Sequence, residues 1–175
     1  MSSTLRISFA KSRALSHRLS VKRAKFVICL NIKEAEIVEY LIKKGANVNA
    51  DKYILSWACE TEQVKVVKLL VDNGADFSDG WPLKFACIVG NKEIVNYLIE
   101  KGANVQAQNN GALVVACYNG RTEIVKILIE NGANVNVQFE NLYTSALAMA
   151  SESGDLELVK FLITNDADVN LRFPI

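Results

Sequence analysis

Apolar residues recur along the chain at helical spacing, in pairs of short segments separated by a turn. In residues 86–99, a first apolar segment ends at Gly90, and a second one then places its apolar residues on one side of a helix. Residues 116–129 align with 86–99 without a gap. Each stretch has a glutamate near the start of its second segment, Glu93 and Glu123, where it suits the positive end of a helix dipole. The pattern predicts a unit of helix, turn and helix.

A short sequence motif, Gly-Ala-Asn/Asp followed by an apolar residue, marks the end of each unit. It begins at Gly45, Gly74, Gly102 and Gly132, and a fifth copy begins at Asp166, so the intervals are 29, 28, 30 and 34 residues. Repetition at this interval indicates stacked units that bury their apolar faces against one another. A glycine here can close the preceding helix in a left-handed conformation, which Asp166 tolerates less well. We therefore expect the fifth unit to fray first.

From residue 34 to 170 the chain resembles the ankyrin-repeat family. The family opens its units with T-P-L-H-x-A, of which Trp81-Pro82-Leu83-Lys84-Phe85-Ala86 keeps Pro, Leu and Ala, while the other units keep Leu and Ala. The signature His is absent from all of them, because the only histidine is His17. The resemblance implies an all-α solenoid of helix-turn-helix units.

The unit boundaries divide the chain into a leader and an array. Residues 1–25 are predicted to be a basic leader or a degenerate N-terminal cap, and residues 26–175 the repeat domain. Its five repeats are expected at 26–52, 53–80, 81–109, 110–142 and 143–175. The loops between units are mostly too short for the usual β-hairpin, and only the one from Val135 to Leu147 is long enough. Such short units look like the ankyrin proteins of giant amoeba-infecting viruses.

Charge is unevenly distributed along the chain. Residues 1–33 hold eight Lys and Arg and no acid, so the rest holds 20 − 8 = 12 bases against all 19 acids, a net charge of −7. This leader is open to three interpretations: a solvated tail or cap, a patch for nucleic acid, nuclear import or an anionic membrane, or an organelle-targeting segment. The apolar run at 26–30 stops at Asn31, far short of the ~18 residues of a membrane span.

The cysteines repeat with the units and indicate a reducing compartment. Cys59, Cys87 and Cys117 each follow an alanine at the same place in three successive units. Helices of adjacent units pack ~8–10 Å apart, beyond the ~7 Å between Cα atoms that a disulfide spans. We expect all four cysteines, Cys29 included, to remain thiols. No C-x-x-C pair is present, so neither zinc nor any other cofactor is expected.

The sequence offers no arrangement for catalysis. It lacks a phosphate-binding G-x-x-x-x-G-K, and it lacks a second histidine to serve a nucleophile. The glutamates recur at one point of the repeat, as dipole partners at the start of each second helix: Glu36, Glu93, Glu123 and Glu157. The chain is therefore expected not to be an enzyme.

The resemblance implies that a partner binds the concave surface lined by the first helices. The outward positions carried over from the family, with Trp81 at the rim, are Trp57, Glu60, Trp81, Phe85, Ile88, Val115, Tyr118, Met149 and Glu152. Most are apolar or aromatic, which is typical of a protein-binding hot spot. The alternative is that Trp57, Trp81 and Phe85 fold over the neighbouring unit. The core positions are expected to be filled by Leu55, Ala58, Leu83, Ala86, Leu113, Ala116, Leu147 and Ala150, so the core is expected not to require the outward side chains.

These patterns predict a monomeric, non-catalytic module that binds an unidentified protein in the cytoplasm, the host cytoplasm if the chain is viral. Two alternatives stay open. Residues 1–33 could tether the chain to nucleic acid or an anionic membrane, or send it to the nucleus or an organelle. The apolar segment 158–163, with no polar cap after it, could instead belong to a structural fragment of a longer array.

Overall fold

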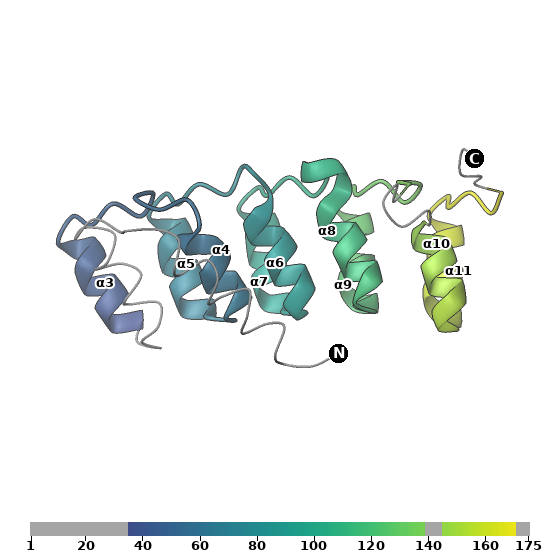
Figure 1. Ribbon diagram of the computed structural model, residues 1–175, viewed down its shortest axis with the longest axis horizontal. Helices are drawn as coiled ribbons and strands as arrows, with labels where there is room; N and C mark the ends of the chain where they lie inside the picture. Colours follow the sequence, from purple (N-terminus) through teal and green to yellow (C-terminus); the bar gives the residue numbers. More distant parts are fainter. Residues whose placement is uncertain (1–34, 139–144, 171–175) are drawn as a thin grey trace, which may run out of the picture.

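The computed structural model describes residues 35–138 and 145–170, and all regular structure in these residues is helical (Figure 1). The leader (1–25), its charges up to residue 33, Cys29 and the centre of the longest loop (139–144) lie outside the described residues. The helices are, in chain order, α3 (Ala35–Lys43), α4 (Ile54–Glu60), α5 (Val64–Asp72), α6 (Trp81–Val89), α7 (Lys92–Glu100), α8 (Ala107–Tyr118), α9 (Thr122–Glu130), α10 (Ala146–Ser153) and α11 (Leu156–Thr164).

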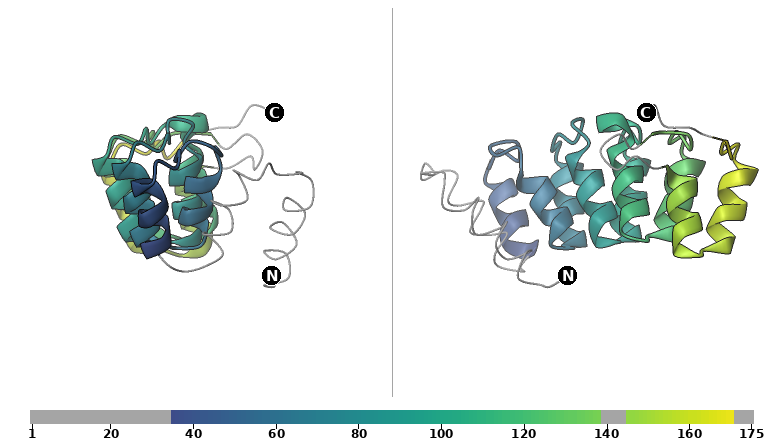
Figure 2. Two further views of the ribbon diagram at one scale, coloured as in Figure 1. Left: turned by 90° about the vertical axis from the view of Figure 1, so that its left-hand side faces the viewer. Right: turned by 45° about the vertical axis from the view of Figure 1, so that its right-hand side comes forward.

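The helices form antiparallel pairs that stack side by side, so that the molecule has two parallel rows (Figure 2). One row, the first-helix row, contains α4, α6, α8 and α10. The other, the second-helix row, contains α3, α5, α7, α9 and α11. Within the first row α6 packs against both α4 and α8, and within the second row α7 packs against both α5 and α9. The prediction of an all-α repeat solenoid is confirmed.

The glycine of each repeated Gly-Ala-Asn/Asp motif lies at the C-terminal end of a second helix. Gly74 follows α5 with φ of 82°, a left-handed conformation that costs glycine little. Its N–H donates to the Val71 carbonyl at 3.0 Å, and the Ala75 N–H donates to the Leu70 carbonyl at 3.0 Å. These two bonds satisfy carbonyl groups that the end of the helix leaves free. The same pair of bonds ends α3, α7 and α9.

Replacing Asp166 with Gly is expected to stabilise the array by a few tenths to about 1 kcal/mol. Asp166 closes α11 with φ of 65° and makes the same backbone bonds as the glycines, so its side chain carries the steric cost that glycine avoids. Asp168, which lies outside the left-handed region, is the matched control, and Asp168→Gly should destabilise. Chemical denaturation measures both changes.

The array is also expected to open from α11, and hydrogen exchange tests this order. No described unit covers the far side of α11, so its amides should exchange before those of α7, which has neighbours on both sides. If α11 were the best-protected helix, both the order of opening and the reason given for it would be wrong.

The core runs between the two rows. Each second helix from α5 onward contributes a leucine with none of its surface exposed, Leu70, Leu98, Leu128 and Leu162. The first helices face them with small residues, of which Ala58 and Ala86 are fully buried, so the rows approach closely. The predicted core positions are confirmed with one exception: Leu147 is half-buried. Leu147 lies in α10, which ends the first-helix row among the described residues and has a first-helix neighbour, α8, on one side only.

Successive loops are joined by asparagine side chains. Asn49 donates to the Gly74 carbonyl at 2.8 Å and accepts from the Asp76 N–H at 2.8 Å. Asn136 makes the equivalent bonds to Asp166 and Asp168. Side-chain bonds of this kind satisfy backbone groups in loops that have no strand pairing in the described residues. The loops therefore form one continuous edge along the array (Figure 1).

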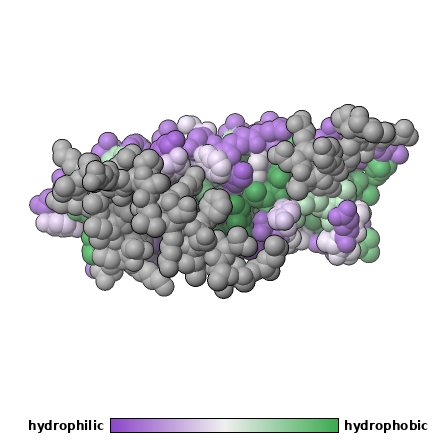
Figure 3. Space-filling model, viewed as in Figure 1, coloured by the Kyte–Doolittle hydropathy of each residue, from purple (hydrophilic) through white to green (hydrophobic). Residues whose placement is uncertain are grey.

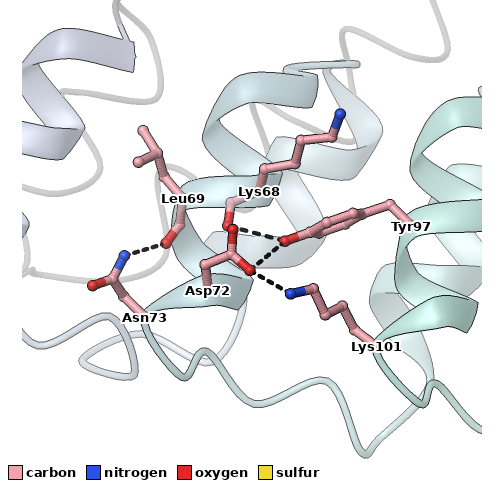
Figure 4. A network of polar contacts seen from close by, with 6 residues as sticks. All are labelled: Lys68, Leu69, Asp72, Asn73, Tyr97 and Lys101. Atoms are coloured by element: carbon pink, nitrogen blue, oxygen red, sulfur yellow. Dashed lines mark hydrogen bonds and ion pairs between the residues drawn. The ribbon is translucent and has the colours of Figure 1, made fainter.

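Polar side chains tie neighbouring units together on the second-helix row (Figure 4). The Asp72 carboxylate accepts from the Tyr97 hydroxyl at 2.7 Å and pairs with Lys101 at 2.6 Å. These hydrogen bonds from Lys101 and Tyr97 lower the pKa of Asp72, while partial burial and the bond to Asp72 raise the pKa of Tyr97. Lys68 pairs with Glu93 at 2.7 Å between the same two helices. The network joins α5 to α7, so these charges serve to connect units.

Candidate functional site

The outward side of the first-helix row, here called the first-helix face, carries the nine residues predicted to bind a partner. Figure 3 looks onto this face and shows apolar surface at its middle. Five of the nine residues are half-buried: Trp57, Phe85, Ile88, Val115 and Met149. The other four are exposed: Glu60, Trp81, Tyr118 and Glu152. The face thus combines half-buried apolar side chains with exposed aromatic and acidic ones.

Trp81 and Phe85 form the aromatic centre of the face. Their rings lie 5.8 Å apart between centroids at an angle of 31°, and Lys84 Nζ lies 4.7 Å from the centroid of the Trp81 ring. The position of Trp81 is fixed by the loop before it, because its N–H donates to the Asp79 carboxylate at 3.1 Å, and Pro82 follows it in the first turn of α6. Trp81 is still 38% exposed. An aromatic pair held in place but accessible suits a binding surface.

Gly80 lets the loop before Trp81 approach the next unit. Its φ of 75° is left-handed, and a Cβ built on it would lie 2.5 Å from Cβ of Ala107. No other residue fits there without displacing α8 or the loop. The loop before Trp81 therefore lies close against Ala107 at the start of the next unit.

Several apolar side chains of the face also pack against the core. Trp57, Phe85, Val115 and Met149 all contact buried residues. The expectation that the core does not use these outward positions is therefore wrong in part. The physical reason is that adjacent first helices touch directly, α4 with α6 and α6 with α8, so large side chains on one helix cover its neighbour. Tyr118, at 65% exposure, is the most accessible apolar residue of the face.

A left-handed turn, missed in the sequence, forms the rim next to Trp81. Gln108, Asn109 and Asn110 lie inside the bounds of α8 but interrupt its right-handed helix, with φ of 54°, 53° and 56°. This conformation costs ~1–2 kcal/mol for most residues and less for asparagine, whose short polar side chain bonds locally. Gln108 donates to the Asp79 carbonyl at 2.6 Å, and Asn110 accepts from the Asn134 N–H at 2.9 Å. The signal in the sequence was Asn109-Asn110-Gly111, a run of residues that tolerate this conformation.

Charge pairing differs between the two rows. All five ion pairs among the described residues join residues of the second-helix row: Lys43–Glu39, Lys68–Glu93, Lys101–Asp72, Lys126–Glu123 and Lys160–Glu157. Glu60 and Glu152 on the first-helix face take part in none of them. Of the bases nearby, Arg121 donates to the Ile88 carbonyl at 3.2 Å. The first-helix face therefore presents, beside its apolar residues, carboxylates that form no ion pair with another described residue.

The cysteines of the first helices are thiols in apolar surroundings. Cys59 and Cys87 have no exposed surface, and Cys117 is half-buried. Desolvation by burial raises the pKa of Cys59 strongly, and it raises the pKa of Cys87 and Cys117 to about 12. Nucleophilic chemistry needs the thiolate, and a high pKa suppresses it at neutral pH.

We expect the cysteines to be reduced and slow to react in the folded protein. Among the three described cysteines, iodoacetamide should modify Cys117 first under native conditions, and Cys59 and Cys87 only on unfolding, because these two are fully buried. After denaturation all four thiols, Cys29 included, should react. Mass spectrometry counts the labels. A bridge between Cys59 and Cys87, or one bound zinc ion per chain, would contradict both the redox prediction and the packing of adjacent units.

Neither a metal site nor a membrane span is found in the part of the chain that the structure describes. No three His, Cys, Asp or Glu side chains there come together in a group that could hold a metal ion. None of the helices in 35–138 and 145–170 has both the length and the apolar character needed to span a bilayer.

Comparison with protein families gives one match that extends over both rows of helices. A family model described as ankyrin repeats, in three copies, matches residues 26–109 and, a second time, residues 106–173. Together the two matches include every described helix from α3 to α11.

Proposed function

Since this chain belongs to the ankyrin-repeat family, whose members generally act as protein-interaction modules, we propose that it binds a protein partner through its first-helix face without catalysing a reaction. The observation that carries the proposal is the exposure of large aromatic side chains there, 38% at Trp81 and 65% at Tyr118. Aromatic residues at accessible positions are frequent binding hot spots. Trp57, Phe85 and Met149 extend the surface along the row.

The surface has the composition expected of an interface centre. Apolar and aromatic side chains lie in the middle, and carboxylates lie at the edges, as with Glu60 and Glu152. Interfaces are commonly arranged this way, with a desolvated centre and a polar rim. The tight contact at Gly80 and the bonds of Gln108 keep this surface preorganised, which reduces the entropy lost on binding.

Affinity capture with matched variants tests the proposal. The intact chain is compared with a variant carrying Phe85→Ala and Tyr118→Ala, and with a control carrying Tyr40→Ala on α3. Tyr40 is 59% exposed but belongs to the second-helix row. Partners retained by the intact chain and the control but lost with the double variant support the first-helix face. Equal retention by all three removes it.

A second candidate function is self-stacking at the last unit. Three large apolar residues are exposed there, Leu156 at 61%, Ile163 at 47% and Val169 at 64%. A further repeat or a second copy packed on α11 could bury them, in the way neighbouring units bury theirs. An apparent molecular mass in solution that rises with protein concentration, and that stays at the monomer value in the Ile163→Glu variant, supports this function.

We place the module in the cytoplasm, on the strength of the buried thiols, which persist in reducing compartments. The short loops keep the resemblance to ankyrin proteins of giant amoeba-infecting viruses as a proposal for its source. The alternative that residues 1–33 tether the chain to nucleic acid or an anionic membrane concerns residues outside the described ones. Binding to nucleic acid or anionic vesicles that weakens steeply with salt, and that is lost when the basic residues of 1–33 are neutralised, supports this alternative.

A further inference from the structure

Carboxylates flank the first-helix face on both sides. On the turn side, Glu60, Glu62 and Glu152 take part in none of the ion pairs among the described residues. On the loop side, the exposed carboxylates of Asp76 and Asp79 lie at a small hollow that is also lined by apolar side chains, while Asp51 at the same hollow is buried. The residues around this hollow are Val48, Asn49, Asp51, Lys52, Leu55, Ala75, Asp76 and Asp79. The face is therefore an apolar strip between two acidic edges.

The bases near this strip are already engaged. Lys84 lies over the Trp81 ring, and Lys52 Nζ lies 4.8 Å from the centroid of the Tyr53 ring. Arg121 donates to a backbone carbonyl. A ligand that complements the strip must therefore bring positive charge together with apolar side chains.

The chain itself contains such a segment. Residues 1–25 hold seven bases and no acid, and apolar residues such as Leu5, Ile7 and Phe9 alternate with polar and basic ones. At ~3.3 Å per extended residue, 25 residues span up to about 80 Å. Neighbouring helices lie ~8–10 Å apart, so α4 to α10 is only about 30 Å. The segment is long enough to reach every unit.

We propose that residues 1–25 bind the first-helix face of their own chain, with basic side chains at the acidic edges and apolar side chains on the aromatic strip. Covalent attachment gives the segment an effective concentration in the millimolar range, so weak contacts suffice. A protein partner must displace it, so the apparent association constant of the partner equals its intrinsic value multiplied by the fraction of molecules whose face is free. The inference rests on the proposed function for the identity of the face and adds regulation to it.

Photo-crosslinking in the full chain, without any partner, tests this contact. p-Benzoylphenylalanine replaces Tyr118, which lies at the end of α8 and far from the point where the leader joins the array. A matched chain carries it at Asn96, an exposed residue of α7 on the opposite row. After irradiation at about 0.1 M salt, the monomer band from the Tyr118 chain should contain crosslinks to residues 1–25, several-fold more than from the Asn96 chain.

Charge variants show whether the acidic edges are responsible for the contact between residues 1–25 and the first-helix face. Glu60→Lys with Glu152→Lys should reduce the crosslink several-fold, as should 1 M salt, at which the Debye length is about 3 Å. Glu100→Lys with Glu130→Lys makes the same change of charge on the second-helix row and should have little effect. Circular dichroism confirms that both pairs fold, since all four side chains are exposed.

Four results overturn the inference. The first two are the absence of leader crosslinks at Tyr118 and equal crosslink yields at Tyr118 and Asn96. The third is an equal loss of crosslink with both charge pairs, which signifies nonspecific electrostatic attraction. The fourth is leader crosslinks found only in a dimer band, because the occupant is then a second copy. None of these results bears on partner binding, which the alanine variants test separately.

Discussion

Replacing Leu98 with Ala is expected to lower the free energy of unfolding by about 2 to 5 kcal/mol. Leu98 belongs to α7 in the middle of the array and has none of its surface exposed. Truncation removes buried methyl groups and leaves a cavity that neighbours on both sides hold open, because α7 packs against α5, α6 and α9. Urea denaturation followed by circular dichroism measures the change.

The same substitution at an exposed site is the control. Leu156 starts α11 and is 61% exposed, so Leu156→Ala should change the free energy of unfolding by about 0.5 kcal/mol or less. Similar losses at Leu98 and Leu156 would show that the leucine row is not the shared core of the stack. If only Leu98→Ala lowers the free energy of unfolding strongly, its loss is the reference against which the stability of the binding variants is judged.

The core and the helix ends could be predicted because each repeats with the units. Leu70, Leu98 and Leu128 recur at intervals of 28 and 30 residues, and a glycine follows each at a fixed distance. Any conformation found at one of these positions must recur at the others if the units stack. Even the left-handed backbone at Asp166 follows from its alignment with the glycines.

The left-handed turn at Gln108 to Asn110 could not be predicted, because no other unit repeats it. Its bonds reach Asp79 and Asn134, which lie 29 and 24 residues away in the chain. Local preference permits this conformation at asparagine but does not select it. The left-handed conformation occurs together with hydrogen bonds to the neighbouring loops, and the sequence does not reveal these bonds.

The outward orientation of the residues on the first-helix face was predictable from the sequence, but the extent of their burial was not. Repeat alignment places Trp57 and Phe85 on the outward side of the first helices. How far they are covered depends on how closely the next first helix approaches, which is set by contacts such as that between Gly80 and Ala107. These side chains are half-buried for that reason, while Tyr118, at the end of its helix, stays exposed.

Replacing Phe85 or Tyr118 with Ala is expected to weaken binding of a protein partner by about 2 kcal/mol or more each. Both lie on the first-helix face, and an anchor that fills a pocket of its partner loses most of that contact when truncated to Ala. Tyr118 is largely exposed, so Tyr118→Ala should leave the free energy of unfolding nearly unchanged. Phe85 also touches the core, so Phe85→Ala should destabilise, though less than Leu98→Ala. Calorimetric titration of a captured partner gives the affinities.

The comparison of Tyr118 with Tyr40 decides between binding and packing. Both are tyrosines with similar exposure, 65% and 59%, on opposite rows of the array. If the first-helix face binds the partner, Tyr118→Ala loses affinity and Tyr40→Ala does not. If the face residues serve only to pack neighbouring units, Phe85→Ala lowers the melting temperature as much as Leu98→Ala does, and both face variants bind with unchanged affinity when folded. That result would remove the first-helix face as the binding surface and leave the fold intact, because the leucine core between the rows does not depend on Tyr118.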